Sequence, residues 1–379
     1  MSFCRTDISE YERKVIYTLQ SSIEKRAREI VEYAFSLHAT DIHIIPKSTH
    51  ASVLFRLSHK LIPKLTIDLE ETERLISYMK FQAAMDIGER RRPQNGSYQM
   101  EIQGEKIGLR LSTLPSVYSE SLVIRLLPQD STIPYEQLSL FPKSTKLLLS
   151  MLKFSHGLII LTGPTGSGKT TTLYSLLRHS TNFLGRNVIT LEDPVEKSSE
   201  DLLQVQVNEK AGITYSAGLK AILRHDPDII MVGEIRDHET AQIAIRAALT
   251  GHLVLTTMHT KDSKGALYRL LEFGVNWHEI EQTLVAVTAQ RLVELICPFC
   301  MEGNCDIYCT HNQKSRTAVY EILYGRALRE SLMEMKGKSM SARYPTLGHL
   351  ISKGIALGFI KETEYERWVH DLEAESLEY

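Results

Sequence analysis

A chain of 379 residues exceeds one typical domain, and its 43% hydrophobic and 24% charged residues are ordinary for a globular protein. Its 44 basic and 46 acidic side chains provide no bulk positive field, which argues against non-specific nucleic-acid binding. No stretch approaches the roughly 18 apolar residues of a spanning helix, and the polar N-terminus lacks the apolar core of a signal peptide. We therefore expect a cytoplasmic protein, or one attached peripherally to a membrane.

Residues 1–128 are predicted to form a first α/β domain. Apolar residues recur at helical spacing over 21–37, and 70–85 is predicted as a second helix. Short apolar segments bounded by turn residues predict strands at 42–45, 53–57, 98–102, 106–111 and 122–127. Residues 129–142 mix polar residues with prolines and are predicted to be an ordered linker, with a hinge near Pro134.

The most informative segment is 157–172, GLIILTGPTGSGKTTT, in which an apolar strand leads into a glycine-rich loop that opens a helix. This is the order of a Walker A loop, whose glycines turn successive N–H groups towards phosphate oxygens at the positive end of the helix. Lys169 would bind the β- and γ-phosphates, and Thr170 would bind Mg²⁺. The residues expected to bind the nucleoside triphosphate and its metal are Gly163, Pro164, Thr165, Gly166, Ser167, Gly168, Lys169, Thr170 and Thr171.

Residues 143–294 are predicted to form the nucleotide-binding core. Apolar strands at 158–161, 188–191, 229–232 and 253–257 alternate with helices, one of them expected to be capped by Ser216. This pattern is typical of a mostly parallel sheet covered on both faces, with ligands at the carboxyl ends of the strands. Residues 295–379 are expected to hold a cysteine-containing segment and C-terminal helices. After Lys361 the chain is strongly acidic, which favours a solvated terminal helix over a partner-facing one.

Two carboxylates follow strands of this core. Glu192, in TLEDPVE, comes after the 188–191 strand, and Glu234, in DPDIIMVGEIRD, stands in the place of a Walker B acid. Downstream of a phosphate-binding loop, Glu192 would orient or deprotonate water and Glu234 would complete the Mg²⁺ site, although each alone could be a solvated carboxylate or a helix cap. His252 and His259 flank the 253–257 strand, where a lone histidine is usually structural.

Four motifs together resemble those of a known family. GPTGSGKTTT, TLEDPVE, LRHDPDIIMVGEIRDHETA and ALTGHLVLTTMHT are similar, in order and spacing, to the Walker A, Asp box, Walker B and His box of the secretion ATPases. These are the traffic ATPases of type II secretion and type IV pilus assembly. The segments ATDIHIIP, DIGERRRPQNG and SESLVIRLLP extend the resemblance over roughly residues 30 to 330.

The resemblance implies a hexameric, Mg²⁺-dependent ATPase with a PAS-like N-terminal domain and a RecA-like core. It specifies ATP as the nucleotide and gives both histidines a role in sensing the γ-phosphate. Arginines of the N-terminal domain would lend positive charge to the triphosphate. At the matching positions these are Arg110 and Arg125, and less directly Arg90, whose alternative role is in salt bridges on the strand face. The implied partner is an inner-membrane platform protein that attaches the ATPase to the cytoplasmic face, without direct nucleic-acid contact.

Within the family, a short chain with complete catalytic boxes and clustered cysteines is similar to the competence traffic ATPases of Gram-positive bacteria. These power assembly of a pseudopilus needed for DNA uptake. The alternatives in the same class are pilus retraction and a type II secretion motor. An alternative from another class is an ATP-switched regulatory protein with little turnover.

Four of the five cysteines crowd into one short segment, which in a reducing compartment suggests a metal site before disulfides. Four thiolates can hold a structural Zn²⁺ tetrahedrally, although the second half of this cluster has unusual spacing and His311 could replace its last member. The alternative is four free thiols. The expected zinc ligands are Cys297, Cys300, Cys305 and Cys309.

Overall fold

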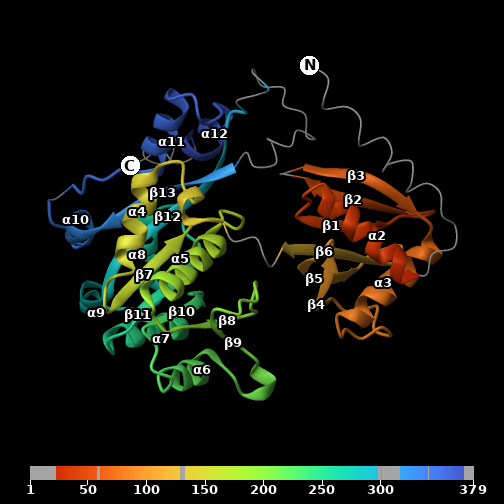
Figure 1. Ribbon diagram of the computed structural model, residues 1–379, viewed down its shortest axis with the longest axis horizontal. Coiled ribbons are helices and arrows are strands. Elements are labelled where there is room, and N and C mark those ends of the chain that lie inside the picture. The colour runs from red at the N-terminus through yellow and green to blue at the C-terminus, as the bar shows by residue number, and fades with distance from the viewer. Residues whose placement is uncertain are drawn as a thin grey trace. The chain divides into compact units, whose positions relative to one another are not determined.

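The computed structural model describes residues 23–57, 60–128, 133–297, 300, 316–339 and 341–370. The chain divides into two compact units, drawn in Figure 1. Of the described residues, 23–57 and 60–128 belong to the first unit, and those from 133 onward belong to the second. Each unit is described by itself below.

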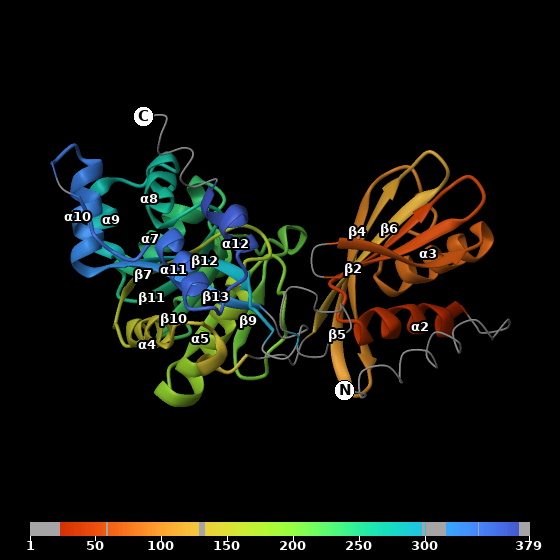
Figure 2. The same cartoon turned by 90° about the horizontal axis from the view of Figure 1, so that it is seen from above.

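The first unit contains a six-stranded antiparallel sheet with the strand order β3-β2-β1-β6-β5-β4. Two helices, α2 (Ile23–Ser36) and α3 (Leu69–Gln82), cover one face of this sheet (Figure 2). Asp68 caps α3 by accepting a hydrogen bond from the backbone N–H of Glu71. The strands are β1 (Asp41–Pro46), β2 (Ala51–Leu57), β3 (Lys60–Ile67), β4 (Gln94–Ile102), β5 (Glu105–Pro115) and β6 (Glu120–Pro128).

The two faces of this sheet differ in chemistry because side chains alternate along each strand. Ile42 is paired with Phe55 and with Ile124, and all three are fully buried beneath the helices. One residue earlier on β1, Asp41 is paired with Arg56 and Arg125. Arg125 is in turn paired with Arg110, so one row on the face away from the helices carries these three arginines and Asp41. We call these four residues the arginine row.

The second unit contains a seven-stranded sheet with the order β13-β12-β7-β11-β10-β8-β9. Every pairing in it is parallel except that between β12 and β13. The strands are β7 (Gly157–Thr162), β8 (Val188–Glu192), β9 (Leu203–Gln206), β10 (Ile229–Glu234), β11 (Leu253–Met258), β12 (Leu284–Glu294) and β13 (Arg316–Tyr324).

Helices cover both faces of this sheet, as Figure 1 shows. Leu158 and Ile160 of β7 pack with α6, α7, α8, α9 and α10, whereas Ile159 and Leu161 pack with α4 and α5 on the other face. This arrangement explains why every residue of β7, β8 and β11 is buried and most of these residues are apolar. The helices are α4 (Pro142–Met151), α5 (Lys169–Leu184), α6 (Tyr215–Ile222), α7 (His238–Leu249), α8 (Ser263–Glu272), α9 (Trp277–Thr283), α10 (Gly325–Met335), α11 (Leu347–Ala356) and α12 (Thr363–Tyr365).

Short segments at both ends of the second unit pack against its core. Near its start, Ser175 Oγ of α5 donates a hydrogen bond to the carbonyl of Ile133, 3.0 Å away. Tyr135 lies in the single turn η1 (Tyr135–Gln137), and the centroid of its ring is 5.1 Å from that of His179 in α5. At the other end, η4 (Glu366–His370) continues from α12 and buries Val369 with α11 and β12.

The predicted fold class is confirmed, because an antiparallel α/β unit precedes a unit built on a mostly parallel sheet covered on both faces. Strands β3, β9, β12 and β13 were not among the predicted elements. The expected cap of α6 was wrong by two residues, since Thr214 accepts the capping hydrogen bond from Ala217. Of the helices in the described part of the chain, none combines the length and apolarity needed to cross a membrane.

Candidate nucleotide-binding site

The glycine-rich loop follows β7 and ends at the first residue of α5, as predicted. Gly163, Gly166 and Gly168 all have positive φ angles, of 150°, 79° and 85°. A Cβ at position 163 would lie 2.6 Å from the carbonyl oxygen of Gln290, and one at position 168 would lie 2.9 Å from the amide nitrogen of Gln290. The loop therefore requires glycine for both its conformation and its close contact with β12. This conformation suits backbone binding of phosphate at a helix N-terminus.

The ammonium group of Lys169 lies inside this loop. Its Nζ donates hydrogen bonds to the carbonyls of Gly163, at 2.7 Å, and Pro164, at 3.1 Å, and the side chain is 8% exposed. Burial lowers the pKa of Lys169 to about 8, although the nearby Glu234 carboxylate opposes this shift. A cation in a poorly solvated loop is suited to binding phosphate oxygens.

Glu234, at the end of β10, forms an ion-pair cluster beside the lysine. Its Oε1 is 3.1 Å from Nε2 of His259, and its Oε2 accepts a hydrogen bond from Nε of Arg236 at 2.8 Å. Burial, together with the charge of Lys169, lowers the pKa of His259, while Glu234 and the backbone of Gly163 raise it. The structure thus brings Lys169, Glu234 and His259 together at the carboxyl ends of neighbouring strands.

Glu192, the last residue of β8, is almost completely buried at 3% exposure. The hydroxyl of Tyr174 donates to both of its oxygens, at 2.9 and 2.7 Å, and Thr190 and Gln204 donate to Oε1 at 2.6 and 3.3 Å. Burial raises the pKa of Glu192, whereas these three hydrogen-bonding groups lower it. The carboxylate is therefore fixed in orientation and biased towards accepting a proton.

The two acids lie at the same edge of the sheet. Strands β8 and β10 are parallel, with Leu191 paired to Val232, so that Glu192 and Glu234 both follow this last pair. Asp237 nearby accepts a hydrogen bond from the backbone N–H of Thr240 and caps α7.

The structure does not place His252 with these residues, which corrects the expectation that both histidines meet the γ-phosphate. His252 precedes β11, and its carbonyl accepts a hydrogen bond from the backbone of Gly157, the first residue of β7. The phosphate loop begins after the last residue of β7, about 20 Å further along the strands. Nδ1 of His252 instead lies 3.1 Å from the hydroxyl of Thr250. Only His259 is at the loop end of β11.

The predicted arginines lie in the first unit. Nε of Arg125 is 2.9 Å from Asp41, which also lies 3.5 Å from Arg56. Arg110 is exposed and forms no ion pair with any described residue. Arg90 is 3.2 Å from Glu73 in an exposed pair. The salt-bridge role is thus observed for Arg125 and Arg90, and Arg110 is the arginine of this group most available to an external anion.

The cysteine cluster is described only in part. Cys297 is buried and Cys300 is half-buried, whereas Cys305, Cys309 and His311 lie outside the described residues. No group of three or more His, Cys, Asp or Glu side chains that could hold a metal is present among the described residues. The four-thiolate site therefore stays a prediction.

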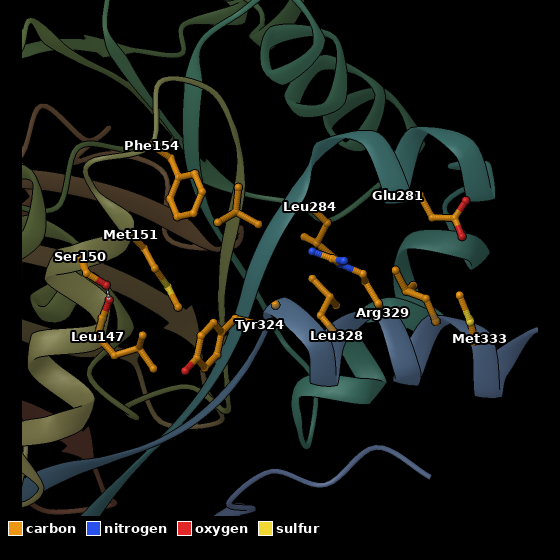
Figure 3. Close-up of a pocket in the computed structure, with 13 residues that line it drawn as sticks. Leu147, Ser150, Met151, Phe154, Glu281, Leu284, Tyr324, Leu328, Arg329 and Met333 are labelled. Carbon is orange, nitrogen blue, oxygen red and sulfur yellow. Dashed lines mark hydrogen bonds between the residues drawn. The ribbon is translucent and has the colours of Figure 1, made fainter. Parts of the chain in front are cut away.

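A separate apolar cavity of about 580 Å³ lies at the opposite end of β7 from the phosphate loop. Figure 3 shows its lining, with Met151 and Phe154 at the end of α4 on one side and Leu328 of α10 on the other. Leu284, which is paired with Leu158 near the start of β7, also lines it. Its position excludes it as the phosphate site.

Several residues that complete the site were missed from the sequence. Tyr174 and Gln204 hold Glu192, but a tyrosine in a helix and a glutamine in a short edge strand give no local signal of this contact. Gln290 and Arg291 lie in β12 against the phosphate loop. Two consecutive polar residues inside a mostly apolar strand were the available signal for that pair.

Comparisons with known proteins agree with the predicted resemblance. The family model described as "Type II/IV secretion system protein" matches residues 18–367. Competence protein ComGA of Bacillus subtilis (strain 168) is 57% identical over 350 residues, which cover 92% of this chain and 98% of that protein. The type II secretion system protein E of Pseudomonas aeruginosa is 43% identical over 274 residues, covering 72% of this chain and 54% of that protein.

Solved structures share the fold. The ATPase DotB of Legionella pneumophila aligns with a TM-score of 0.72 at 20% identity, covering 94% of this chain and 98% of that one. The pilus retraction motor PilT, solved with bound ADP, aligns with a TM-score of 0.65 at 26% identity, covering 89% and 94%. With a family model matching most of its length and a relative at 57% identity, this chain belongs to the type II/IV secretion system protein family.

Proposed function

We propose that this chain is a hexameric, Mg²⁺-dependent ATPase that powers assembly of a competence-type pseudopilus needed for DNA uptake. The observation that carries the ATPase part is the buried Lys169 inside a glycine-rich loop, next to the Glu234 and His259 pair. The similarity to a competence protein over nearly the whole chain supports the biological role.

The residues present fit ATP and its metal. The glycine-rich loop would bind the phosphates through its backbone N–H groups, with Lys169 supplying positive charge. Thr170 and Glu234 would hold Mg²⁺, which neutralises charge on the phosphates when it is bound. Glu192 is fixed by Tyr174 and has a raised pKa, so it is suited to orient and deprotonate the attacking water. His259, paired with Glu234, would report the γ-phosphate.

The arginine row supports action of the first unit on a nucleotide. Arg110 would act as the charge donor, because Arg125 is already paired with Asp41 and would need to exchange that partner. In a hexamer this contact can be made within one chain or between neighbours. The proposed partner is an inner-membrane platform protein, through which the ATPase is held at the cytoplasmic face, and no direct nucleic-acid contact is proposed. A structural Zn²⁺ on the cysteine cluster completes the proposal.

The decisive test is the amount of surface-assembled pilin in host cells that express either the wild type or Lys169→Ala at the same level. Loss of the polymer in the variant is expected if ATP use drives assembly, because Lys169 is the buried cation of the phosphate loop. Accumulation of polymer would instead identify a retraction motor. Unchanged polymer would contradict any motor role in this pathway.

The pH dependence of ATP use gives a second test of the site. Lys169, with a pKa of about 8, is charged below that pH and loses its proton as the pH rises through it. Because kcat/KM reports the free enzyme, it is expected to fall about tenfold per pH unit above pH 8. Bound phosphate stabilises the charged lysine, so kcat should stay flat to a higher pH.

The matched control for this profile is Lys169→Arg. A guanidinium stays protonated throughout this range, so the variant should lose the alkaline limb whatever its absolute rate. An alkaline limb of kcat/KM that persists unchanged in Lys169→Arg would assign the titration to another group. Both profiles are measured by phosphate release over a series of pH values.

A further inference from the structure

Two consecutive polar residues, Gln290 and Arg291, lie in the middle of β12, with apolar residues on both sides. They are 1% and 5% exposed, so neither serves solubility. Because the guanidinium of Arg291 is buried and its charge is poorly solvated, its pKa is lowered. An apolar pair would fill a purely structural position at lower cost in free energy.

Gln290 contacts the phosphate loop directly. Its Nε2 donates a hydrogen bond of 2.6 Å to the carbonyl of Ser167. The same amide nitrogen leaves no room for a side chain at Gly168, the residue before Lys169. The position of this glutamine therefore fixes the backbone from which Lys169 extends.

Arg291 connects this contact to the segment that follows His259. Its Nη1 donates to the carbonyl of Gln290 at 3.0 Å, and its Nη2 donates to the carbonyl of Lys261 at 2.5 Å. Thr260, between His259 and Lys261, is hydrogen-bonded through its backbone N–H and its hydroxyl to the hydroxyl of Thr162 at the end of β7. One guanidinium thus links the strand beneath the phosphate loop to the backbone beside the predicted γ-phosphate sensor.

Helix α12 and the turn η4, together called the C-terminal helix below, cover this guanidinium. The ring of Trp368 lies with its centroid 5.2 Å from Cζ of Arg291, within the range of a cation–π contact. The indole N–H of Trp368 donates to Glu364 at 2.7 Å, and Glu364 is only 2% exposed. Val369, 1% exposed, packs in the same cluster as Val293 of β12. The described part of this segment, residues 361–370, is therefore packed against the core, which corrects the expectation of a solvated terminal helix there, and residues 371–379 lie outside the described residues.

We propose that Arg291 is a positioning residue for ATP binding and that Trp368 holds it in place, so that the C-terminal helix is part of the nucleotide site's support. The inference deepens the proposed ATPase function and rests on it. Displacing the helix would release Arg291 from Trp368 and loosen both the phosphate loop and the segment after His259. Anything that binds the C-terminal segment would thereby change ATP affinity.

The test measures the affinity of the full chain for the non-hydrolysable analogue AMP-PNP with Mg²⁺ by calorimetry. Trp368→Leu removes the aromatic face and keeps an apolar side chain, and it is expected to raise Kd about 3- to 10-fold. Arg291→Lys keeps the charge and loses the fork that reaches two carbonyls, and it is expected to raise Kd about 10-fold or more. Trp368→Phe, the matched control, keeps a ring face and should stay within about 2-fold of wild type.

Thermal unfolding separates positioning from a general loss of stability. Without nucleotide, Trp368→Leu and Trp368→Phe should unfold at similar temperatures, whereas the rise in Tm caused by AMP-PNP should shrink only in Trp368→Leu. In a Trp277→Phe background the remaining indole is that of Trp368, because the chain has two tryptophans. Its emission should then change on AMP-PNP binding, with a midpoint equal to the calorimetric Kd.

Lys169→Ala distinguishes failure of this inference from failure of the proposed site. If Lys169→Ala abolishes binding while folded Trp368→Leu and Arg291→Lys bind AMP-PNP as wild type does, the positioning role is overturned and the nucleotide site stands. If Lys169→Ala binds normally, the proposed site itself is wrong. If Arg291→Lys fails to fold, the comparison of Trp368→Leu with Trp368→Phe alone tests the positioning role.

Discussion

Glu192→Gln is expected to lower kcat for ATP hydrolysis by about 10³-fold while changing the Kd for ATP by less than about 3-fold. The glutamine has nearly the same shape and keeps an oxygen that accepts from Tyr174 and Thr190. The glutamine cannot take a proton from water, so the substitution lowers kcat and leaves the affinity for ATP intact. Phosphate release and calorimetric titration with ATP measure the two quantities separately.

The matched control is Tyr174→Phe, which removes the hydroxyl that donates to both oxygens of Glu192. That hydrogen bond lowers the pKa of Glu192, so its removal should raise the pKa further. A carboxylate must be ionised to act as a base, and the activity is lost as pH falls through its pKa. The acid limb of the kcat profile is therefore expected to move to higher pH in Tyr174→Phe.

A kcat of Glu192→Gln within about tenfold of wild type would contradict the role of Glu192 as the base. Glu234→Gln then identifies the alternative, because Glu234 lies close to Lys169 and His259. Full ATP binding without hydrolysis in wild type would support the regulatory alternative. A large loss of kcat in Glu192→Gln counts against that alternative, since it shows that turnover matters.

The second large effect is expected on stability. Lys80 and Glu120 of the first unit are 1% and 4% exposed at their side chains and lie 3.0 Å apart, and Lys80 also donates to the carbonyl of Glu89. Lys80→Met would leave Glu120 buried without its cation. The free energy of unfolding of the first unit should fall by about 3–5 kcal/mol, because an uncompensated buried charge is costly.

Two variants test whether the cause is the unpaired charge. Lys80→Met combined with Glu120→Leu removes both charges and should recover most of the lost stability. Arg90→Gln breaks the exposed Arg90 and Glu73 pair and should cost less than about 1 kcal/mol. Hydrogen exchange of peptides from residues 23–128 reports this unit by itself. A double variant no more stable than Lys80→Met would show that packing, not charge, is responsible.

The phosphate loop and the two acids could be predicted because their signals are local. The glycine spacing before Lys169 is typical of the phosphate-binding loop. A carboxylate at the carboxyl end of an apolar parallel strand lies at the edge of the sheet where ligands bind. The role of His252 was implied by the resemblance alone, whereas the same rule places this histidine away from the ligand edge, because it precedes β11. His259, which follows β11, reaches the site.

Other features depend on pairing between distant segments and could not be read from their own sequence. Lys80 resembles an ordinary exposed helix residue until β6 places Glu120 against it. The need for glycine at position 96 becomes clear only in the fold, where a Cβ would lie 2.5 Å from the carbonyl oxygen of Ala83 and 2.7 Å from the Met85 side chain. Strand β3 was missed because Pro63 and its lysines conceal a weak alternation of edge residues.

The packing of residues 133–137 on α5 sets the length of the link between the phosphate loop and the segment that leads to the first unit. Helix α5 starts at Lys169, and its residue Ser175 holds the carbonyl of Ile133. Six residues of helix span about 9 Å, or a little under two turns. This stretch of α5 begins at the phosphate loop and ends at the segment leading to the first unit. In the proposed motor, movement would then pass from the phosphate loop to that segment along one helix, without a relay through the sheet.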